Sequence, residues 1–195
     1  MSITTPEVDA LDRADMERLA AGADPALNDL MERHATPVFH FLCRMLGDEQ
    51  DAEDLAQETF VRVYRSRATF RTTEKFSTWL YTIAANLARN HFRWRSRHPT
   101  VSLDTEAESG EAGAAHVVSR EPPPDRQIQT LERAEQVREA VRALPPEMRE
   151  VMVLCEWEER TVAEAAAILK TTPKSVESRL YRARLLLKKQ LARWL

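Results

Sequence analysis

The amino-acid sequence predicts an all-α protein in which two small helical domains are joined by a flexible acidic linker. Apolar residues recur at three- and four-residue steps through most of the 195-residue chain, which is the spacing of amphipathic helices. Only 4 residues are glycine and 30% are charged, a composition that also favours helices. The periodicity is lost over residues 99–126, and an unpatterned segment of that length indicates a boundary between two domains.

The first domain is expected over residues 24–98, after an N-terminal arm. Residues 1–23 are polar and acidic with little periodicity, so we expect a loose arm that holds at most one short helix. Asp24–Pro25 is predicted to open the first long helix, and Thr36–Pro37 to restart it. Gly47 is predicted to end it.

The next predicted helix, residues 51–66, has an acidic face opposite its apolar stripe. Acids in a first turn are favoured by the helix dipole alone, which is a sufficient explanation for Asp51 and Glu53. Glu58 lies beyond that turn and is explained less well.

A long amphipathic helix is predicted from Phe76 to Arg97, after a polar loop that contains Phe70. Its last turns interleave four arginines with two aromatic residues and an asparagine over residues 89–97. Arginines hold phosphates while aromatic rings stack on exposed bases, a combination used for single-stranded nucleic acid. Alternatively, the same residues are long basic side chains that cover an apolar surface.

Residues 99–126 are predicted to be the linker. They contain Gly110, Gly113 and three consecutive prolines, and carry six acids against two bases.

The second domain is expected over residues 127–195 and contains a helix-turn-helix pattern. Thr161 and Glu164 have the spacing of a capping box, which begins the first helix of the pair. Thr172 can cap the second helix, with Pro173 at its first position.

The second helix of the pair combines a buried stripe with a basic outer face. From residue 170 to residue 195 there are eight Lys or Arg and one Glu, as expected of a helix that enters the major groove. The alternative is a solvated basic face on the last helix of a bundle. The stripe comprises Val176, Leu180, Ala183, Leu187 and Leu191.

The formal net charge of −3 is the sum of an acidic and a basic part of the chain. Residues 1–60 carry fourteen acids and four bases, whereas residues 170–195 are strongly basic.

The two cysteines, Cys43 and Cys155, and five scattered histidines give neither a disulfide framework nor metal-ligand spacing, so no metal or cofactor is expected. No apolar run is long enough to span a bilayer and no signal segment is present, so we expect a cytoplasmic protein without direct membrane insertion.

Two stretches together resemble the extracytoplasmic-function (ECF) group of bacterial sigma factors, the small two-domain members of the sigma-70 family. The first is DAEDLAQETFVRVY at 51–64, continuing to FSTWLYTIAANLARN at 76–90. The second is LPPEMREVMVL at 144–154, continuing to SVESRLYRAR at 175–184. The resemblance covers roughly residues 24–191, in order and spacing.

The resemblance implies a promoter-specificity subunit without catalytic chemistry of its own. Its partners would be core RNA polymerase, through the beta-prime coiled coil and the beta subunit, promoter DNA, and an anti-sigma factor. The acidic face would dock on polymerase, and the linker would lie in the RNA path. The implied polymerase contacts are Asp54, Gln57 and Glu58.

The resemblance also implies two sites on promoter DNA. In the first domain, Phe70, Tyr81 and Asn86 would form the pocket for a base flipped out of the minus-10 element, because such a pocket needs an aromatic wall and an amide. The implied phosphate contacts beside this pocket are Arg89, Asn90, Arg93 and Arg97. The implied minus-35 contacts are Lys174, Glu177, Ser178, Tyr181 and Arg182 near the bases, with Arg179 and Arg184 on phosphates.

Four positions depart from the family pattern. Glu177 stands where many members have Lys or Arg, and its carboxylate could accept a hydrogen bond from a cytosine amino group. Lys170 stands where the turn commonly has glycine, so a left-handed backbone there would cost about 1 kcal/mol or more. Glu159–Arg160 replaces a Gly-Leu pair before the helix-turn-helix.

Two other functions remain open at this point. A stand-alone helix-turn-helix regulator would use the C-terminal third but would leave the acidic face and the basic helix end unexplained. A protein-interaction module would use neither DNA surface. An enzyme is the weakest candidate, because the chain has no phosphate-binding glycine loop and no nucleophile spaced beside a base.

Overall fold

Helices account for nearly all of the computed structural model, which describes residues 5–98 and 124–192; side chains of the second segment are described from residue 133. Within these residues the fold is all-α, as predicted, with no strand. Most of the predicted linker, up to residue 123, lies outside the described residues. The helices are α1 (Thr5–Ala20), α2 (Ala26–Leu46), α3 (Glu49–Arg65), the 3-10 turn η1 (Arg67–Thr69), α4 (Phe76–Arg97), α5 (Pro124–Arg142), α6 (Pro146–Met152), the π-helical turn η2 (Val153–Trp157), α7 (Val162–Leu169) and α8 (Pro173–Leu191).

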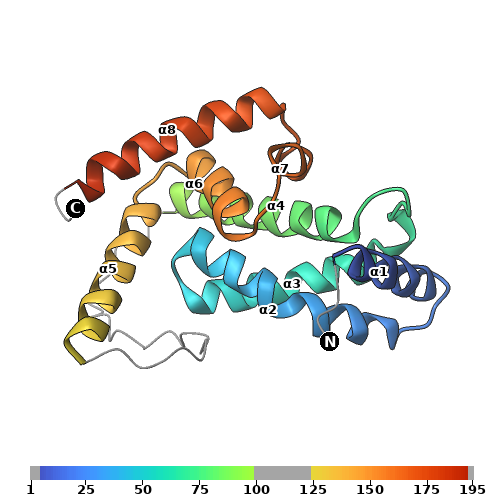
Figure 1. Ribbon diagram of the computed structural model, residues 1–195. Helices are drawn as coiled ribbons and strands as arrows, with labels where there is room; N and C mark the ends of the chain where they lie inside the picture. The colour runs from blue at the N-terminus through green and yellow to red at the C-terminus, as the bar shows by residue number, and fades with distance from the viewer. Residues whose placement is uncertain (1–4, 99–123, 193–195) are drawn as a thin grey trace.

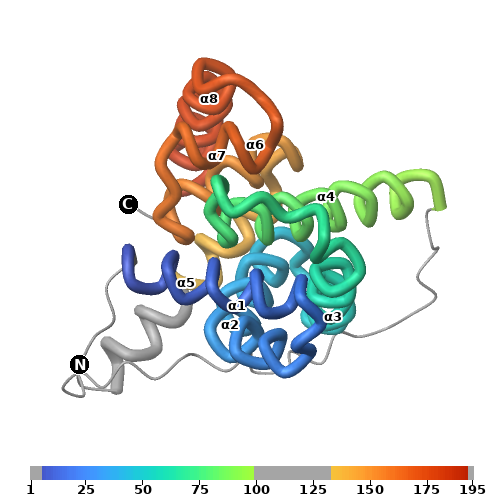
Figure 2. Tube along the Cα trace, turned by 90° about the vertical axis from the view of Figure 1, so that its right-hand side faces the viewer, coloured from blue at the N-terminus to red at the C-terminus, as the bar shows by residue number. Residues whose placement is uncertain are grey.

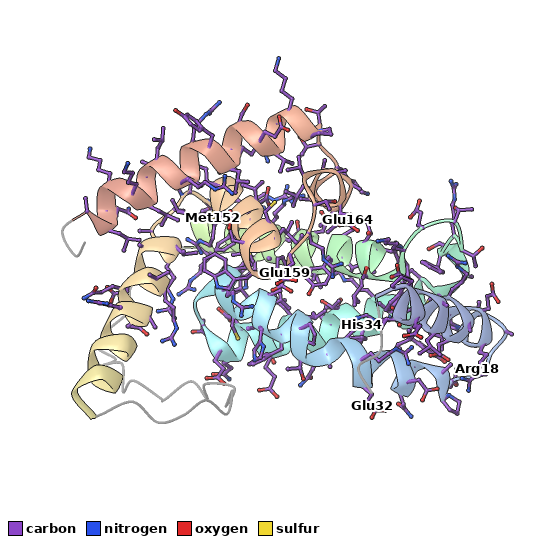
Figure 3. The ribbon with its side chains drawn as sticks, viewed as in Figure 1. Arg18, Glu32, His34, Met152, Glu159 and Glu164 are labelled. Atoms are coloured by element: carbon purple, nitrogen blue, oxygen red, sulfur yellow. The ribbon has the colours of Figure 1, made fainter. Side chains whose placement is uncertain are left out.

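Helix α1 is packed against the rest of the molecule, so the prediction of a loose N-terminal arm is wrong for residues 5–20. Met16 and Leu19 are fully buried. The carboxylate of Asp12 is also buried, and it accepts hydrogen bonds from Arg33 Nε at 2.9 Å and from His34 Nε2 at 2.7 Å. His34 is labelled in Figure 3 on the part of α2 that lies beside α1. A buried carboxylate is tolerated only when its charge is paired. The partners are more than twenty positions away, so helical spacing could not reveal this contact.

Helix α2 is continuous through Pro37, so the prediction that it restarts at Thr36–Pro37 is wrong. Proline removes one intrahelical hydrogen bond. Val38 and Phe41, which follow Pro37, are fully buried, and their packing compensates for the lost hydrogen bond. The helix ends as predicted at Gly47, which has the left-handed φ of 75°.

Helices α2, α3 and α4 form the core of the N-terminal group. The Asp48 carboxylate caps α3 by accepting from the Asp51 N–H at 2.9 Å. Helix α4 has the predicted bounds, and its end projects beyond the neighbouring helices in Figure 2. The residues near that end are therefore accessible from several sides.

The C-terminal group contains the predicted helix-turn-helix, formed by α7 and α8. The capping box of Thr161 and Glu164 is confirmed, as is the cap of α8 by Thr172 with Pro173 following it. The turn between the helices has Lys170 in the left-handed conformation, with φ 51° and ψ 49°. Glu159 also has φ 51°. Lys170 and Glu159 occupy the two positions where the family pattern has glycine. Both have the left-handed backbone conformation that glycine adopts most easily.

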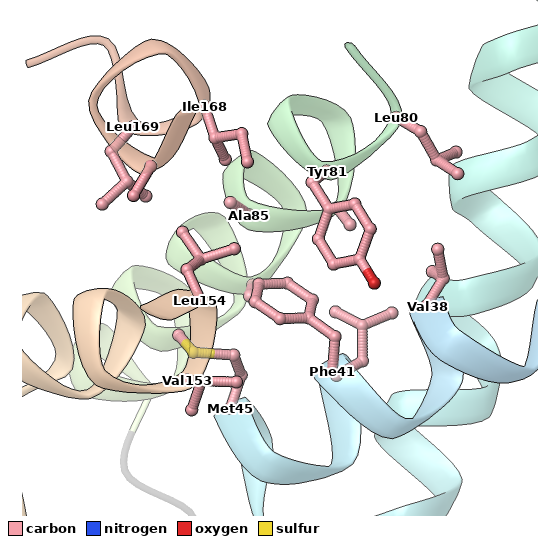
Figure 4. Packing of buried hydrophobic residues seen from close by; sticks show 14 of the residues in the cluster. Val38, Phe41, Met45, Leu80, Tyr81, Ala85, Val153, Leu154, Ile168 and Leu169 are labelled. Carbon is pink, nitrogen blue, oxygen red and sulfur yellow. The ribbon is translucent and has the colours of Figure 1, made fainter. Parts of the chain in front are cut away.

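The two groups of helices pack against each other along α4. In Figures 1 and 2, α1, α2 and α3 lie on one side of α4, and α6, α7 and α8 lie on the other. Figure 4 shows Leu154 and Ile168 from the C-terminal group against Phe41, Tyr81 and Ala85 from the N-terminal group. The two domains therefore share one buried apolar core in this structure.

No helix within the described segments combines the length and apolar character that crossing a membrane requires.

Candidate nucleic-acid interface

The outer face of α8 presents the predicted minus-35 residues to solvent. Val176, Leu180 and Ala183 are buried beneath it. Tyr181 has 66% of its surface exposed, which is unusual for a large aromatic side chain. Of the other predicted base contacts, Lys174, Glu177 and Arg182 are exposed and Ser178 is half-buried.

The two arginines predicted to hold minus-35 phosphates are engaged by carboxylates of their own domain. Arg184 Nη2 lies 2.5 Å from Glu156 Oε1, and the arginine side chain is 60% exposed. Arg179 Nη1 lies 3.3 Å from Glu150 Oε1 in a more buried position. An exposed pair such as that of Arg184 is worth little and exchanges readily for phosphate.

The projecting end of α4 is the second basic surface. Arg93 and Arg97 are exposed, and the Asn90 side chain accepts a 2.5 Å hydrogen bond from Arg93 Nη2. Trp94 is 56% exposed and stacks on the ring of His98 at 5.0 Å. Exposed arginines beside an exposed aromatic ring are the side chains that single-stranded nucleic acid requires.

A groove between α3 and α4 adjoins this surface. It has a volume of about 450 Å³ and contains Asn86, one of the predicted base contacts. Arg62 and Arg65 at its rim were not predicted from the sequence, because their position depends on how α3 packs on α4. The other residues lining the groove are Glu58, Arg62, Arg65, Ser66 and Ile83.

Phe70 lies in the loop before α4, with its ring 5.3 Å from Trp79 and 6.1 Å from Phe76. Trp79 and Asn86 are seven residues apart on α4 and so share a face of that helix. Tyr81 is on another side, 1% exposed, and does not join Phe70 and Asn86. The predicted pocket of Phe70, Tyr81 and Asn86 is therefore not assembled here, and Trp79 is the ring that accompanies Phe70.

Tyr81 is instead held in the contact between the two domains. Its hydroxyl donates a 2.5 Å hydrogen bond to Glu158 Oε2, and the Arg160 guanidinium lies 4.7 Å from the centre of its ring. Burial raises the pKa of Tyr81 and the negative charge of Glu158 raises it further, so this hydroxyl stays protonated as a donor. The Phe41 ring closes the other side at 5.2 Å.

Glu158 and Glu150 of the C-terminal group form ion pairs and hydrogen bonds across that contact. Glu158 lies 3.1 Å from Arg44 Nη1 as well as bonding Tyr81. Burial raises the pKa of Glu158, against the opposing effects of the Tyr81 hydrogen bond and the Arg44 charge. Glu150 is 3% exposed and lies 2.7 Å from Arg89 Nε, on the side away from Arg179. Neither glutamate was predicted from the sequence, because their partners are distant in the chain.

The predicted polymerase-binding residues lie on α3. Asp54 and Gln57 are exposed, whereas Glu58 accepts a 2.8 Å hydrogen bond from Arg62 Nε. Gln57 also borders a largely apolar groove of about 430 Å³ between α2 and α3, to which Met31 and Phe39 contribute. The acidic face thus adjoins an apolar surface suited to a protein partner.

These features define a two-domain helical protein that carries two different nucleic-acid surfaces, a helix-turn-helix and a basic, aromatic helix end. Two family models match the chain: Sigma-70 region 2 over residues 30–98, and Sigma-70 region 4 over residues 134–187. The chain belongs to the sigma-70 family, in its ECF group.

Individual relatives agree with this assignment. The chain is 32% identical over 178 residues to the ECF RNA polymerase sigma factor SigW of Bacillus subtilis, covering 90% of this chain and 94% of the relative. It is 36% identical over 167 residues to the RNA polymerase sigma factor CarQ of Myxococcus xanthus, covering 86% and 90%. The fold is similar to that of CnrH in a solved complex with the cytosolic domain of CnrY, with a TM-score of 0.68, 26% identity and coverage of 93% and 97%.

Proposed function

We propose that this chain is a promoter-specificity subunit that joins core RNA polymerase, recognises the minus-35 and minus-10 elements, and promotes opening of the DNA. The observation that carries this proposal is the presence of two basic surfaces of different kinds on one chain. One surface is a recognition helix suited to duplex DNA, and the other is an arginine-rich, aromatic helix end suited to single strands.

Helix α8 supplies the minus-35 contact. Lys174, Tyr181 and Arg182 face the bases from the major groove, and Glu177 accepts from a cytosine amino group. Arg179 and Arg184 exchange their glutamate partners for backbone phosphates. The minus-35 element stays paired, because a major groove is read without melting.

The α3–α4 groove and the end of α4 supply the minus-10 contact. A base leaving the stack meets the Asn86 amide and the rings of Phe70 and Trp79, while Arg93 and Arg97 hold the adjoining phosphates. Unstacking costs a few kcal/mol per base, and capture of the extruded base offsets this cost. The chain supplies binding energy for melting, and it performs no covalent step of its own.

The face of α3 that includes Asp54, Gln57 and Glu58 supplies the polymerase contact, on the beta-prime coiled coil, with a second contact to the beta subunit. CnrH is solved in complex with CnrY, and another structural neighbour is in complex with the anti-sigma factor NepR. We propose that this chain likewise has a protein inhibitor. It would work in the cytoplasm, where polymerase and promoter meet.

Run-off transcription with core polymerase on a promoter library tests this function. Transcription is expected only when this chain and core enzyme are both present, and Asn86→Ala or Arg182→Ala is expected to reduce it. Full activity of both variants would favour a protein-interaction module. Strong specific binding of a promoter duplex by the free chain, unchanged by core enzyme, would favour a stand-alone regulator.

A further inference from the structure

The loop that carries Phe70 rests on α1. Helix α1 packs against η1, at the start of this loop, and against α4, which follows it. Figure 1 shows α1 beside the loop between α3 and α4. At the end of the loop, Lys75 Nζ lies 3.6 Å from Asp9 Oδ2 on α1. Because the proposed function assigns the Phe70 ring to the extruded base, α1 supports a part of the proposed minus-10 site.

A chain of aromatic contacts connects α2 to Phe70. The His34 ring meets the Phe76 ring edge-on, with the ring centres 5.2 Å apart and the planes at 60°. Phe76 is 2% exposed, and its ring lies 6.1 Å from Phe70 and 6.2 Å from Trp79. Ring pairs at these separations prefer defined orientations. The orientation of Phe76 therefore links His34 to the two rings of the proposed base site.

The buried carboxylate of Asp12 on α1 holds the His34 ring. Asp12 Oδ2 accepts a hydrogen bond from His34 Nε2 at 2.7 Å, while Oδ1 accepts from Arg33 Nε at 2.9 Å. Arg33 Nη2 also donates to Asp15 Oδ2 at 2.5 Å, so this arginine is fixed to α1 at two points. Hydrogen bonds to a charged acceptor are stronger than neutral ones, so the contact with Asp12 restricts rotation of the His34 ring.

The polar character of this contact favours a positioning role over simple attachment of α1. Taking a carboxylate out of water is costly, and apolar residues of similar size often hold two helices at least as firmly. Met16 and Leu19, which are buried on α1, already supply apolar attachment. Asp12 and His34 add directional hydrogen bonds, and both are too buried to contact DNA. Their effect on DNA therefore has to pass through Phe76.

We propose that Asp12 and His34 are positioning residues for the minus-10 site. They orient Phe76, and the Phe76 ring in turn orients Phe70 and Trp79 to receive the extruded base. This inference rests on the proposed function for the role of the last two rings. Loss of Asp12 or His34 is expected to weaken recognition of the extruded base itself, while contacts to the adjoining phosphates and to the minus-35 element remain.

The experiment measures recognition of one base by the full chain bound to core polymerase. The probe is a forked promoter DNA in which the minus-35 element is paired and one strand of the minus-10 element is unpaired. Each minus-10 base is removed in turn to leave an abasic position, and the position whose loss weakens wild-type binding most is chosen. Stacking of a base on aromatic rings corresponds to about tenfold in affinity, so the wild type is expected to bind this abasic probe about tenfold more weakly than the intact probe.

The test variants are Asp12→Ala and His34→Gln, the second of which keeps a donor for Asp12 and removes only the ring. Both are expected to bind the abasic probe as the wild type does and the intact probe about tenfold more weakly, so that the two affinities become nearly equal. Phe70→Ala is expected to give the same result, because it removes the ring that the base would contact.

The matched controls are Glu17→Ala, an exposed change on α1, and His40→Gln on α2, where the His40 ring lies beside Phe39. Both should keep the wild-type ratio of affinities. Circular dichroism melting checks that each variant is folded, and His34→Gln decides alone if Asp12→Ala does not fold. An equal loss of affinity for both probes, or an unchanged ratio in the folded test variants, would overturn the positioning role.

Fluorine NMR separates failure of this inference from failure of the proposed function. With para-fluorophenylalanine at position 70, the fluorine signal of the free chain is expected to shift in His34→Gln and to stay in place in His40→Gln. An unchanged signal in His34→Gln would show that His34 does not act on the Phe70 ring. A shifted signal in a chain that binds no forked promoter with core polymerase would instead overturn the proposed function and leave the aromatic link in place.

Discussion

Lys170 and Glu159 show how single residues depart from the family pattern without altering the fold. Both have a φ of 51°, in the left-handed region where a Cβ is unfavourable. The Lys170 backbone N–H nevertheless bonds to the Ala166 and Ala167 carbonyls, which ends α7 correctly. The chain therefore keeps the turn and accepts local strain.

Replacing Lys170 by glycine is expected to stabilise the protein. Relief of the left-handed strain is worth about 1 kcal/mol, less the entropy that glycine adds to the unfolded chain. Chemical denaturation of the wild type and of Lys170→Gly measures the difference. Lys170→Ala is the control, because it removes the charge and keeps the Cβ; an equal gain in that variant would show that strain is not the cause.

Glu177 is expected to determine one base of the minus-35 element. A carboxylate accepts from cytosine, whereas an amide pairs with adenine, so Glu177→Gln should move the preference at one position from C·G to A·T. The expected change in discrimination is about 1–3 kcal/mol. Selection of bound duplexes from a randomised library by the reconstituted holoenzyme measures it. An unchanged consensus sequence would show that Glu177 does not recognise a base. Glu139→Gln on α5 is the control for the loss of an exposed carboxylate.

At the scale of single elements, local patterns predicted structure well and distant contacts were missed. The capping box of Thr161 and Glu164 is a local signal, and α7 begins where that signal places it. The bounds of α4 follow from its apolar period in the same way. The position of α1 depends on Asp12, whose partners Arg33 and His34 are on another helix. The amphipathic period of α1 is too weak to indicate that burial.

Helix α1 is expected to be held less firmly when the buried Asp12 carboxylate is lost, with the Asp15 carboxylate still paired with Arg33. Asp12→Ala leaves Arg33 and His34 without that acceptor, and a lost buried hydrogen bond of this kind costs about 1–3 kcal/mol. Hydrogen exchange should therefore quicken throughout α1. Glu17→Ala, an exposed change on the same helix, is the control, and equal protection in the two variants would contradict the anchoring role of Asp12.

The start of α7 is expected to weaken in acid. Burial by itself raises the pKa of Glu164. Hydrogen bonds from Lys75 and Thr161 and the charge of Lys75 outweigh that effect and lower the pKa of Glu164 to about 2. The folded-state pKa lies below the ordinary value of 4.5, so the stabilisation is present above pH 4.5 and is lost as the pH falls toward 2. Asp9 lies 3.6 Å from the same Lys75 nitrogen, so the effect of its carboxylate on acid stability is measured separately.

Thermal melting between pH 5 and pH 2 measures this effect. The melting temperature of Glu164→Gln should fall less steeply with acid than that of the wild type, because the variant has no carboxylate at this position to protonate. Asp9→Asn serves as the comparison for the other acid beside Lys75. Parallel curves for the wild type and Glu164→Gln would show that Glu164 is not responsible.

At the scale of the whole molecule, the sequence predicted two domains and their separate surfaces but not their mutual arrangement. Tyr81 and Glu158 are 77 positions apart, and neither residue type nor spacing indicates that they meet. The same is true of Arg89 and Glu150. Assignment of Tyr81 to a base pocket came from resemblance, and in this structure the C-terminal domain occupies the space beside it.

In the proposed function, one chain binds paired DNA with α8 and separated strands with α4 while it is bound to polymerase. Permanganate probing of unpaired thymines in a promoter tests it most directly. Reactive thymines are expected at the minus-10 element only when core polymerase and this chain are both present, and they should diminish with Arg182→Ala and with Arg93→Ala. Failure of the wild-type chain to open any promoter with core polymerase, or undiminished opening by both variants, would overturn the proposed function.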